Sequence, residues 1–124
     1  MEDLNIQASE RKLAVSLSCS GKLSFTGRSI PEDAKAFFTP IVNWLQEYAL
    51  APAPRTECSL KMEYFNSSSR KCFVDVFHIL DSIRKQGNTI VIIWHYEEDD
   101  DELKEIGEKY RSIYEMMEFQ LIPY

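Results

Sequence analysis

The chain has 124 residues, of which 44% are hydrophobic and 12% aromatic, a composition that supports a folded core and excludes a disordered chain. Acidic residues outnumber basic ones by 20 to 14, and six of the acids are consecutive at positions 97–102, so the rest of the chain is neutral. This balance leaves no basic surplus for nucleic-acid phosphates and no attraction to an anionic membrane surface. One domain spanning residues 1–124 is expected at this length.

The N-terminal residues 1–10 are polar and are expected to form a flexible extension. They lack the apolar stretch of a signal peptide, and the longest apolar run, residues 90–94, is far shorter than the roughly 20 residues of a membrane-spanning helix. The three cysteines are widely spaced and include no Cys-x-x-Cys pair, which argues against a disulfide framework or a zinc site. Together these features predict a cytoplasmic protein with reduced thiols.

The first predicted element is a β-hairpin. Apolar residues alternate with small or polar ones over residues 13–19, Ser20-Gly21 marks a turn, and the alternation resumes from Leu23 to Phe25. This pattern is typical of two antiparallel strands with one buried face.

A helix is expected to follow the hairpin, because Ser29 lies three residues before Glu32 and a proline stands between them. Apolar residues then recur at helical spacing as far as Tyr48 and form one broad aromatic face, which is typical of a helix that packs on a core. Pro40 interrupts this pattern. It predicts either a kink or a second helical segment capped by Thr39.

The rest of the chain alternates strands with helices. The pattern predicts a strand within 56–65, a helix from Arg70 to a C-cap at Gly87, a β-branched central strand at 89–96, a helix opened by the acidic run and a short strand at 119–122. The order β-β-α-β-α-β-α-β predicts an α/β fold, in which a small mixed β-sheet combines an N-terminal antiparallel hairpin with right-handed β-α-β crossovers.

Two loops at the carboxyl ends of predicted strands are candidate sites, because sites collect there in sheets of this kind. The first is a segment made of Tyr64, Phe65, Asn66, Ser67, Ser68, Ser69, Arg70 and Lys71. Basic residues in a first helical turn oppose the helix dipole, and they make sense if an anion, such as a phosphoryl group on a serine, sits there. The alternative is that the serines only cap the helix, one of them as the N-cap.

The second loop follows Trp94 and carries the acidic run. If the strands at 56–65 and 89–96 are neighbours, this loop lies beside the serine segment, and its candidate partner-binding residues are His95, Tyr96, Asp99 and Asp100. The acids suit either a solvated helix start or recognition by a basic groove of a partner. A magnesium site is disfavoured, since consecutive acids cannot all face one ion. Neither a metal nor a cofactor is expected.

Catalytic motifs are lacking in this sequence. It contains no Gly-x-Ser-x-Gly elbow, no phosphate-binding Gly-rich loop and no His-Glu-x-x-His pair. His95 could serve as a base, but a lone histidine at a strand end is more often a packed or hydrogen-bonded side chain. The chain is therefore expected not to be an enzyme.

Four motifs in order carry a resemblance to a known family. They are GRSIPEDA at 27–34, FFTPIVNWL at 37–45, YFNSSS at 64–69 and WHYEEDD at 94–100. Together they resemble the SiaC family of bacterial regulatory phosphoproteins, and the resemblance covers about residues 11–122. Members of this family are similar in fold to the STAS domains of anti-sigma-factor antagonists, which agrees with the element order predicted above.

The resemblance implies a partner switch. A Ser/Thr kinase of the histidine-kinase-like ATPase type would phosphorylate the hydroxyl residue after the asparagine, which is Ser67 here, and a PPM-type phosphatase would remove the group. The unphosphorylated form would bind and activate an effector, such as a diguanylate cyclase that makes cyclic di-GMP. The family motif has threonine where this chain has Ser67, so the choice between Ser67 and Ser68 stays open. An anti-sigma-factor-antagonist-like switch with another effector, or a passive protein-binding scaffold, are the alternatives.

Overall fold

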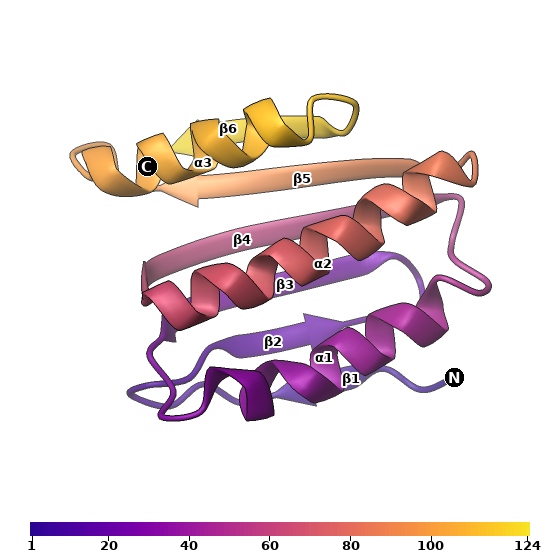
Figure 1. Ribbon diagram of the computed structural model, residues 1–124, viewed down its shortest axis with the longest axis horizontal. Helices are drawn as coiled ribbons and strands as arrows, with labels where there is room; N and C mark the ends of the chain where they lie inside the picture. Colours follow the sequence, from indigo (N-terminus) through magenta and orange to yellow (C-terminus); the bar gives the residue numbers. More distant parts are fainter.

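A computed structural model describes residues 1–124 and shows one six-stranded sheet whose strands lie side by side in chain order (Figure 1). The strands are β1 (Leu4–Ile6), β2 (Ala14–Leu17), β3 (Lys22–Ser29), β4 (Arg55–Phe65), β5 (Thr89–Tyr96) and β6 (Glu118–Pro123). The helices are α1 (Ala34–Tyr48), α2 (Ser67–Lys85) and α3 (Asp101–Ile113). Pairing is antiparallel from β1 to β3 and parallel from β3 to β6. The predicted class, a small mixed α/β sheet with crossovers, is confirmed.

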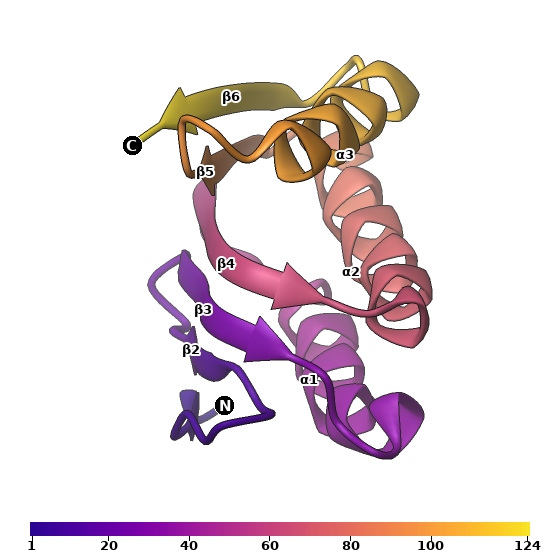
Figure 2. The ribbon, with the colours of Figure 1, turned by 90° about the vertical axis from the view of Figure 1, so that its left-hand side faces the viewer.

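All three helices cover the same face of the sheet (Figure 2). This follows from the topology, because each crossover moves to the next strand in the same direction and takes the same hand. The opposite face of the sheet carries no helix. Over β3 and β4 this face is polar and is crossed by two ion pairs, Lys22 with Glu57 at 2.9 Å and Arg28 with Glu63 at 3.1 Å.

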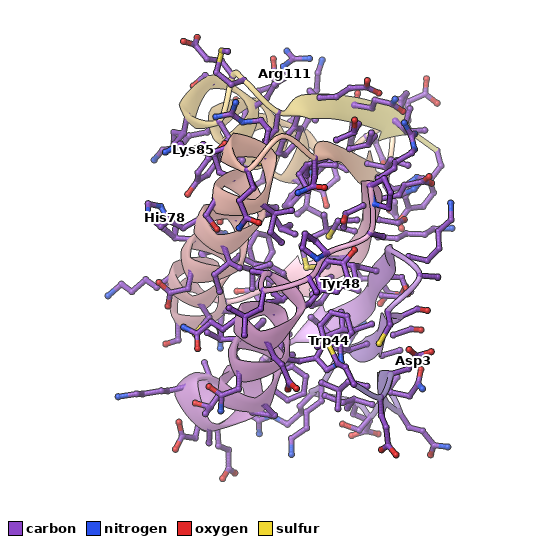
Figure 3. The ribbon with its side chains drawn as sticks, turned by 90° about the vertical axis from the view of Figure 1, so that its right-hand side faces the viewer. Asp3, Trp44, Tyr48, His78, Lys85 and Arg111 are labelled. Carbon is purple, nitrogen blue, oxygen red and sulfur yellow. The ribbon has the colours of Figure 1, made fainter.

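The N-terminal residues are part of the sheet. Leu4–Ile6 pair with β2, and the indole Nε1 of Trp44 donates to the carbonyl oxygen of Glu2 at 2.8 Å. Trp44 itself stacks on Tyr48 at the end of α1 with ring centroids 5.1 Å apart (Figure 3). The prediction of a flexible extension at residues 1–10 is therefore wrong for residues 2–6, and the order of elements gains a strand at its start.

The first helix begins later than predicted. Its N-cap is Asp33, which accepts a hydrogen bond from Ala36 N at 3.0 Å, whereas Ser29 is the last residue of β3. The helix continues through Pro40, so of the two alternatives the second segment capped by Thr39 does not form. Pro40 lies on the exposed side of the helix, where the carbonyl that loses its N–H partner can bind water.

The core lies between the sheet and the helices, and aromatic side chains fill its centre. Phe73 of α2 makes edge contacts with Phe25, Phe38 and Phe65 at centroid distances of 5.1–5.7 Å. Such pairs add roughly 0.5–1.5 kcal/mol beyond the area they bury. This cluster fixes the start of α2 against the ends of β3 and β4.

No helix has the combination of length and apolar character that crossing a membrane requires.

The third helix approaches the sheet closely at a glycine. A Cβ on Gly107 would lie 2.5 Å from Cδ1 of Trp94, so only glycine allows this approach. The indole Nε1 of Trp94 donates to the carbonyl oxygen of Leu103 at 3.0 Å. The close contact at Gly107 and the hydrogen bond to Leu103 therefore fix the position of α3 over β5, next to the end of the sheet that carries the candidate site.

Candidate functional site

The serine segment forms the start of α2, at the carboxyl ends of β3 and β4. Asn66 is the N-cap, and its side-chain oxygen accepts a hydrogen bond from Ser69 N at 2.9 Å. The helix starts at Ser67, three residues before the predicted start at Arg70. The alternative in which a serine fills the N-cap is wrong, because all three serines lie in the first turn.

The three serines have different environments. Ser69 is 0% exposed, its hydroxyl donates to the carbonyl oxygen of Ser29 at 3.1 Å, and its Oγ lies 2.7 Å from the Ser29 Oγ. Ser67 and Ser68 are both exposed and their hydroxyls have no hydrogen-bond partner in the protein. Only these two hydroxyls are therefore accessible to another protein, while Ser69 joins the start of α2 to the end of β3.

The first turn of α2 presents unpaired donors. The backbone N–H groups of Ser67 and Ser68 have no partner four residues earlier within the helix, and they carry the positive end of the helix dipole. No acidic residue lies in this turn. Lys71 is exposed and forms no ion pair. An anion at this position would meet N–H donors and a positive local potential.

Arg70 connects the serine segment to α3. Its Nη2 lies 2.7 Å from Oε1 of Glu102, and its guanidinium stands 5.3 Å from the ring centre of Phe65. The Nε atom is buried without a partner. The Arg70 carbonyl accepts a hydrogen bond from the Tyr110 hydroxyl at 3.3 Å, and burial raises the pKa of Tyr110 to about 12, so this phenol stays protonated and can donate. Arg70 and Lys71 therefore differ, because only Arg70 is held in place.

The second loop lies next to the first, as predicted, because β4 and β5 are parallel neighbours. The acidic run divides into three parts. Residues 97–99, including the exposed Asp99, form the loop, while Asp100 is the N-cap of α3 and accepts from Leu103 N at 3.0 Å. Asp101 and Glu102 lie in the first turn of the helix. The carboxylate of Asp100 is therefore engaged in capping, and that of Asp99 is free at the surface.

Two other predicted surface residues lie elsewhere. Tyr96 is only 8% exposed and belongs to the core, so the prediction that it forms part of a partner surface is wrong. His95 faces the side of the sheet without helices, opposite Lys61, and its pKa is lowered by partial burial and by that lysine. It therefore does not lie with the serine segment. Tyr64, at the end of β4, is 51% exposed.

The chemistry available at this end of the sheet is that of recognition and modification. Neither exposed serine is hydrogen bonded to a histidine or a carboxylate that could activate it as a nucleophile. No group of three or more His, Cys, Asp or Glu side chains is arranged to hold a metal ion. The site instead combines accessible hydroxyls, a helix N-terminus, cations on α2 and carboxylates on the adjoining loop.

Sequence reasoning missed the partners that hold the site in place. The Ser29 hydroxyl and the Glu102 carboxylate lie 40 and 32 residues from Ser69 and Arg70, the side chains that they contact. No local pattern predicts pairs at such separations. One signal was available, a serine at the last position of a strand. A hydroxyl that is buried there needs a hydrogen-bond partner.

Comparison with known proteins identifies the family. The model of the SiaC family, described as regulatory phosphoproteins, matches residues 6–124. An uncharacterised protein of Pseudomonas aeruginosa is 27% identical over 90% of both chains. The crystal structure of apo-SiaC from Pseudomonas aeruginosa has a TM-score of 0.84 at 27% identity and covers 99% of this chain and 98% of that one.

A further solved structure similar to this chain is SiaC of Pseudomonas aeruginosa in complex with the diguanylate cyclase SiaD, which it activates. That SiaC chain has a TM-score of 0.84 at 26% identity, and 98% of each chain is covered. The resemblance seen in the four sequence motifs is thus confirmed over the whole fold. This chain belongs to the SiaC family of regulatory phosphoproteins.

Proposed function

We propose that this chain is the switch protein of a bacterial partner-switching module. In this proposal its unphosphorylated form binds and activates a diguanylate cyclase, and phosphorylation of Ser67 ends that activity. Support comes from membership of a family of regulatory phosphoproteins, and from the SiaC of Pseudomonas aeruginosa that is found in complex with the cyclase it activates. The observation that carries the assignment is the exposed hydroxyl of Ser67, directly after the Asn66 cap, next to a buried Ser69.

The covalent cycle needs two enzymes. A Ser/Thr kinase of the histidine-kinase-like ATPase type transfers the terminal phosphoryl group of ATP to the Ser67 oxygen, and a PPM-type phosphatase hydrolyses the phosphoester. The chain itself turns over no substrate. We place the cycle in the cytoplasm, where ATP is available and where the free Cys19, Cys58 and Cys72 stay reduced.

Charge is the physical basis of the proposed switch. A phosphoryl group adds about −1.5 to −2 charges at pH 7, at the end of the sheet that already carries residues 97–102. The first-turn N–H groups of α2 stabilise that charge within the protein. A partner that docks over this end of the sheet must desolvate the phosphoryl group. Every 1.4 kcal/mol of binding free energy lost in this way reduces the affinity about tenfold.

Mapping of the phosphoryl group tests the acceptor. The protein is incubated with ATP and a Ser/Thr kinase of the histidine-kinase-like ATPase type from the same bacterium, and the product is examined by intact mass and peptide mapping. Wild type and Ser68→Ala are expected to gain one phosphoryl group, and Ser67→Ala none. Phosphate that persists in Ser67→Ala would contradict the assignment.

Activation of a cyclase tests the effector. Unphosphorylated protein is expected to raise cyclic di-GMP synthesis by a purified diguanylate cyclase from the same bacterium, and fully phosphorylated protein is expected to leave it at its basal rate. Equal activation by both forms would point to a passive scaffold. Phosphorylation-dependent binding of another protein without any effect on a cyclase would point to a switch like that of the anti-sigma-factor antagonists.

A further inference from the structure

A groove separates α2 from α3 beside the serine segment. Two tyrosines join the helices: Tyr110 of α3 donates to the carbonyl of Arg70 at 3.3 Å, and Tyr114, the C-cap of α3, donates to that of Val74 at 3.4 Å. Above this contact lies an open groove of about 250 Å³. Its volume is below the roughly 300–1,000 Å³ of small-molecule sites, which favours the side chains of a protein segment as its contents.

The walls of the groove are apolar and exposed. Val74 on α2 is 45% exposed and Ile113 on α3 is 57% exposed, and Ile106 on α3 also lines the groove. No other element of this chain covers the Ile113 side chain. Burial of these apolar side chains by a partner would remove them from water and favour binding.

The rim of the groove is basic, although the chain has a net charge of −6. Arg70 and Lys71 stand on α2 and Lys109 on α3, and none of the residues that line the groove is acidic. Lys71 and Lys109 have no carboxylate within ion-pair distance. Arg70 is paired with Glu102, which shows that a carboxylate reaches this rim. The groove is therefore complementary to an acidic segment.

We infer that this groove binds an acidic amphipathic segment of the effector, with an apolar side chain between Val74 and Ile113 and carboxylates on Lys71 and Lys109. This inference rests on the proposed function, which it deepens by naming the surface and the chemistry of the partner. It also connects the surface to the switch. Ser67 lies three and four residues before Arg70 and Lys71 on one helix face, so its phosphoryl group competes with the partner's carboxylates for these cations.

A peptide titration tests the groove directly. The probe is a synthetic peptide of about 15 residues with leucine at helical spacing and glutamate elsewhere, compared with a peptide in which lysine replaces every glutamate. Added to the isotope-labelled full chain, the acidic peptide is expected to shift the amide signals of α2 and α3 around the groove. Lys109→Glu is expected to weaken its binding about tenfold, whereas Lys104→Glu, on the same helix but outside the groove, is not. Equal binding of both peptides, or the absence of shifts at the groove, would overturn the inference.

The effector provides the second arm of the test. Calorimetry with the cyclase that responds in the activation assay is expected to show about tenfold weaker binding for Lys109→Glu and Ile113→Ser, and unchanged binding for Lys104→Glu. Unchanged binding of all three variants would overturn the inference while the proposed function stands. If no cyclase binds wild type, the proposed function fails, and the peptide titration still decides the groove. If the wild-type chain forms a dimer in solution and Lys109→Glu does not, the groove binds a second copy of this chain, which would also overturn the inference.

Discussion

Replacing Ser69 by alanine removes the link between the start of α2 and the end of β3. The Ser69 hydroxyl donates to the Ser29 carbonyl at 3.1 Å and lies 2.7 Å from the Ser29 hydroxyl, and both residues are 0% exposed. Two buried hydrogen bonds contribute about 1 kcal/mol each, and leaving the Ser29 hydroxyl without a partner costs about 1–3 kcal/mol. We therefore expect the free energy of unfolding to fall by about 3 kcal/mol, a substantial part of the roughly 5–15 kcal/mol of a small domain.

Equilibrium unfolding in urea, followed by tryptophan fluorescence, measures this change. Ser68→Ala is the matched control, because its exposed side chain makes no hydrogen bond, and it is expected to change the unfolding free energy by less than about 0.5 kcal/mol. In the double variant Ser29→Ala/Ser69→Ala no buried hydroxyl is left without a hydrogen-bond partner. The combined loss of unfolding free energy is therefore expected to be smaller than the sum of the single losses by about 1 kcal/mol. A Ser69→Ala protein as stable as wild type, or strictly additive losses, would refute the reasoning.

Three other predictions concern packing, reactivity and the N-terminus. Gly107→Ala places a Cβ 2.5 Å from Trp94. The overpacking is expected to cost near the upper end of about 1–3 kcal/mol, which exceeds the roughly 1 kcal/mol by which alanine stabilises a helix relative to glycine. The melting temperature is therefore expected to fall, and an unchanged or higher value contradicts this prediction. Burial raises the pKa of all three thiols, that of the fully buried Cys58 to about 12. At pH 8 the partly exposed Cys19 and Cys72 are therefore expected to react with a thiol reagent before Cys58, and early labelling at position 58 in a peptide map counts against this. Trp44→Phe loses the hydrogen bond to the Glu2 carbonyl, about 1 kcal/mol, so amide exchange in β1 is expected to become about fivefold faster, whereas unaltered exchange shows that this bond does not hold the strand.

The elements that a local pattern determines could be predicted from the sequence. The strand at 89–96 has the predicted bounds, because seven of its eight residues are β-branched or aromatic and favour a strand. The face of β4 that alternates from Cys58 to Met62 is buried as the period of two requires. The neighbouring positions of β4 and β5 followed from the order of strands and helices, and so the two candidate loops were correctly placed side by side.

The features that the sequence did not predict depend on contacts between distant residues. Leu4–Ile6 are too few to show a period, and they form a strand because β2 offers an edge and Trp44 holds the backbone at Glu2. Ser29 has the spacing of a capping residue, but a buried hydroxyl on α2 retains it in the sheet. Tyr96 was predicted to be a partner-binding residue of the second loop, whereas the alternation of β5 turns it toward the helices.

If a kinase modifies this segment as proposed, the burial of Ser69 limits its choice of acceptor. The segment presents three identical side chains in a row, so a kinase that reads only the local sequence could not separate them. In the folded protein the choice is restricted to Ser67 and Ser68, because the third hydroxyl is inside the molecule. The fold therefore supplies part of the specificity that a sequence motif normally provides. The number of phosphoryl groups that a non-selective kinase adds to this segment would in turn report the fraction of molecules in which the first turn of α2 has opened.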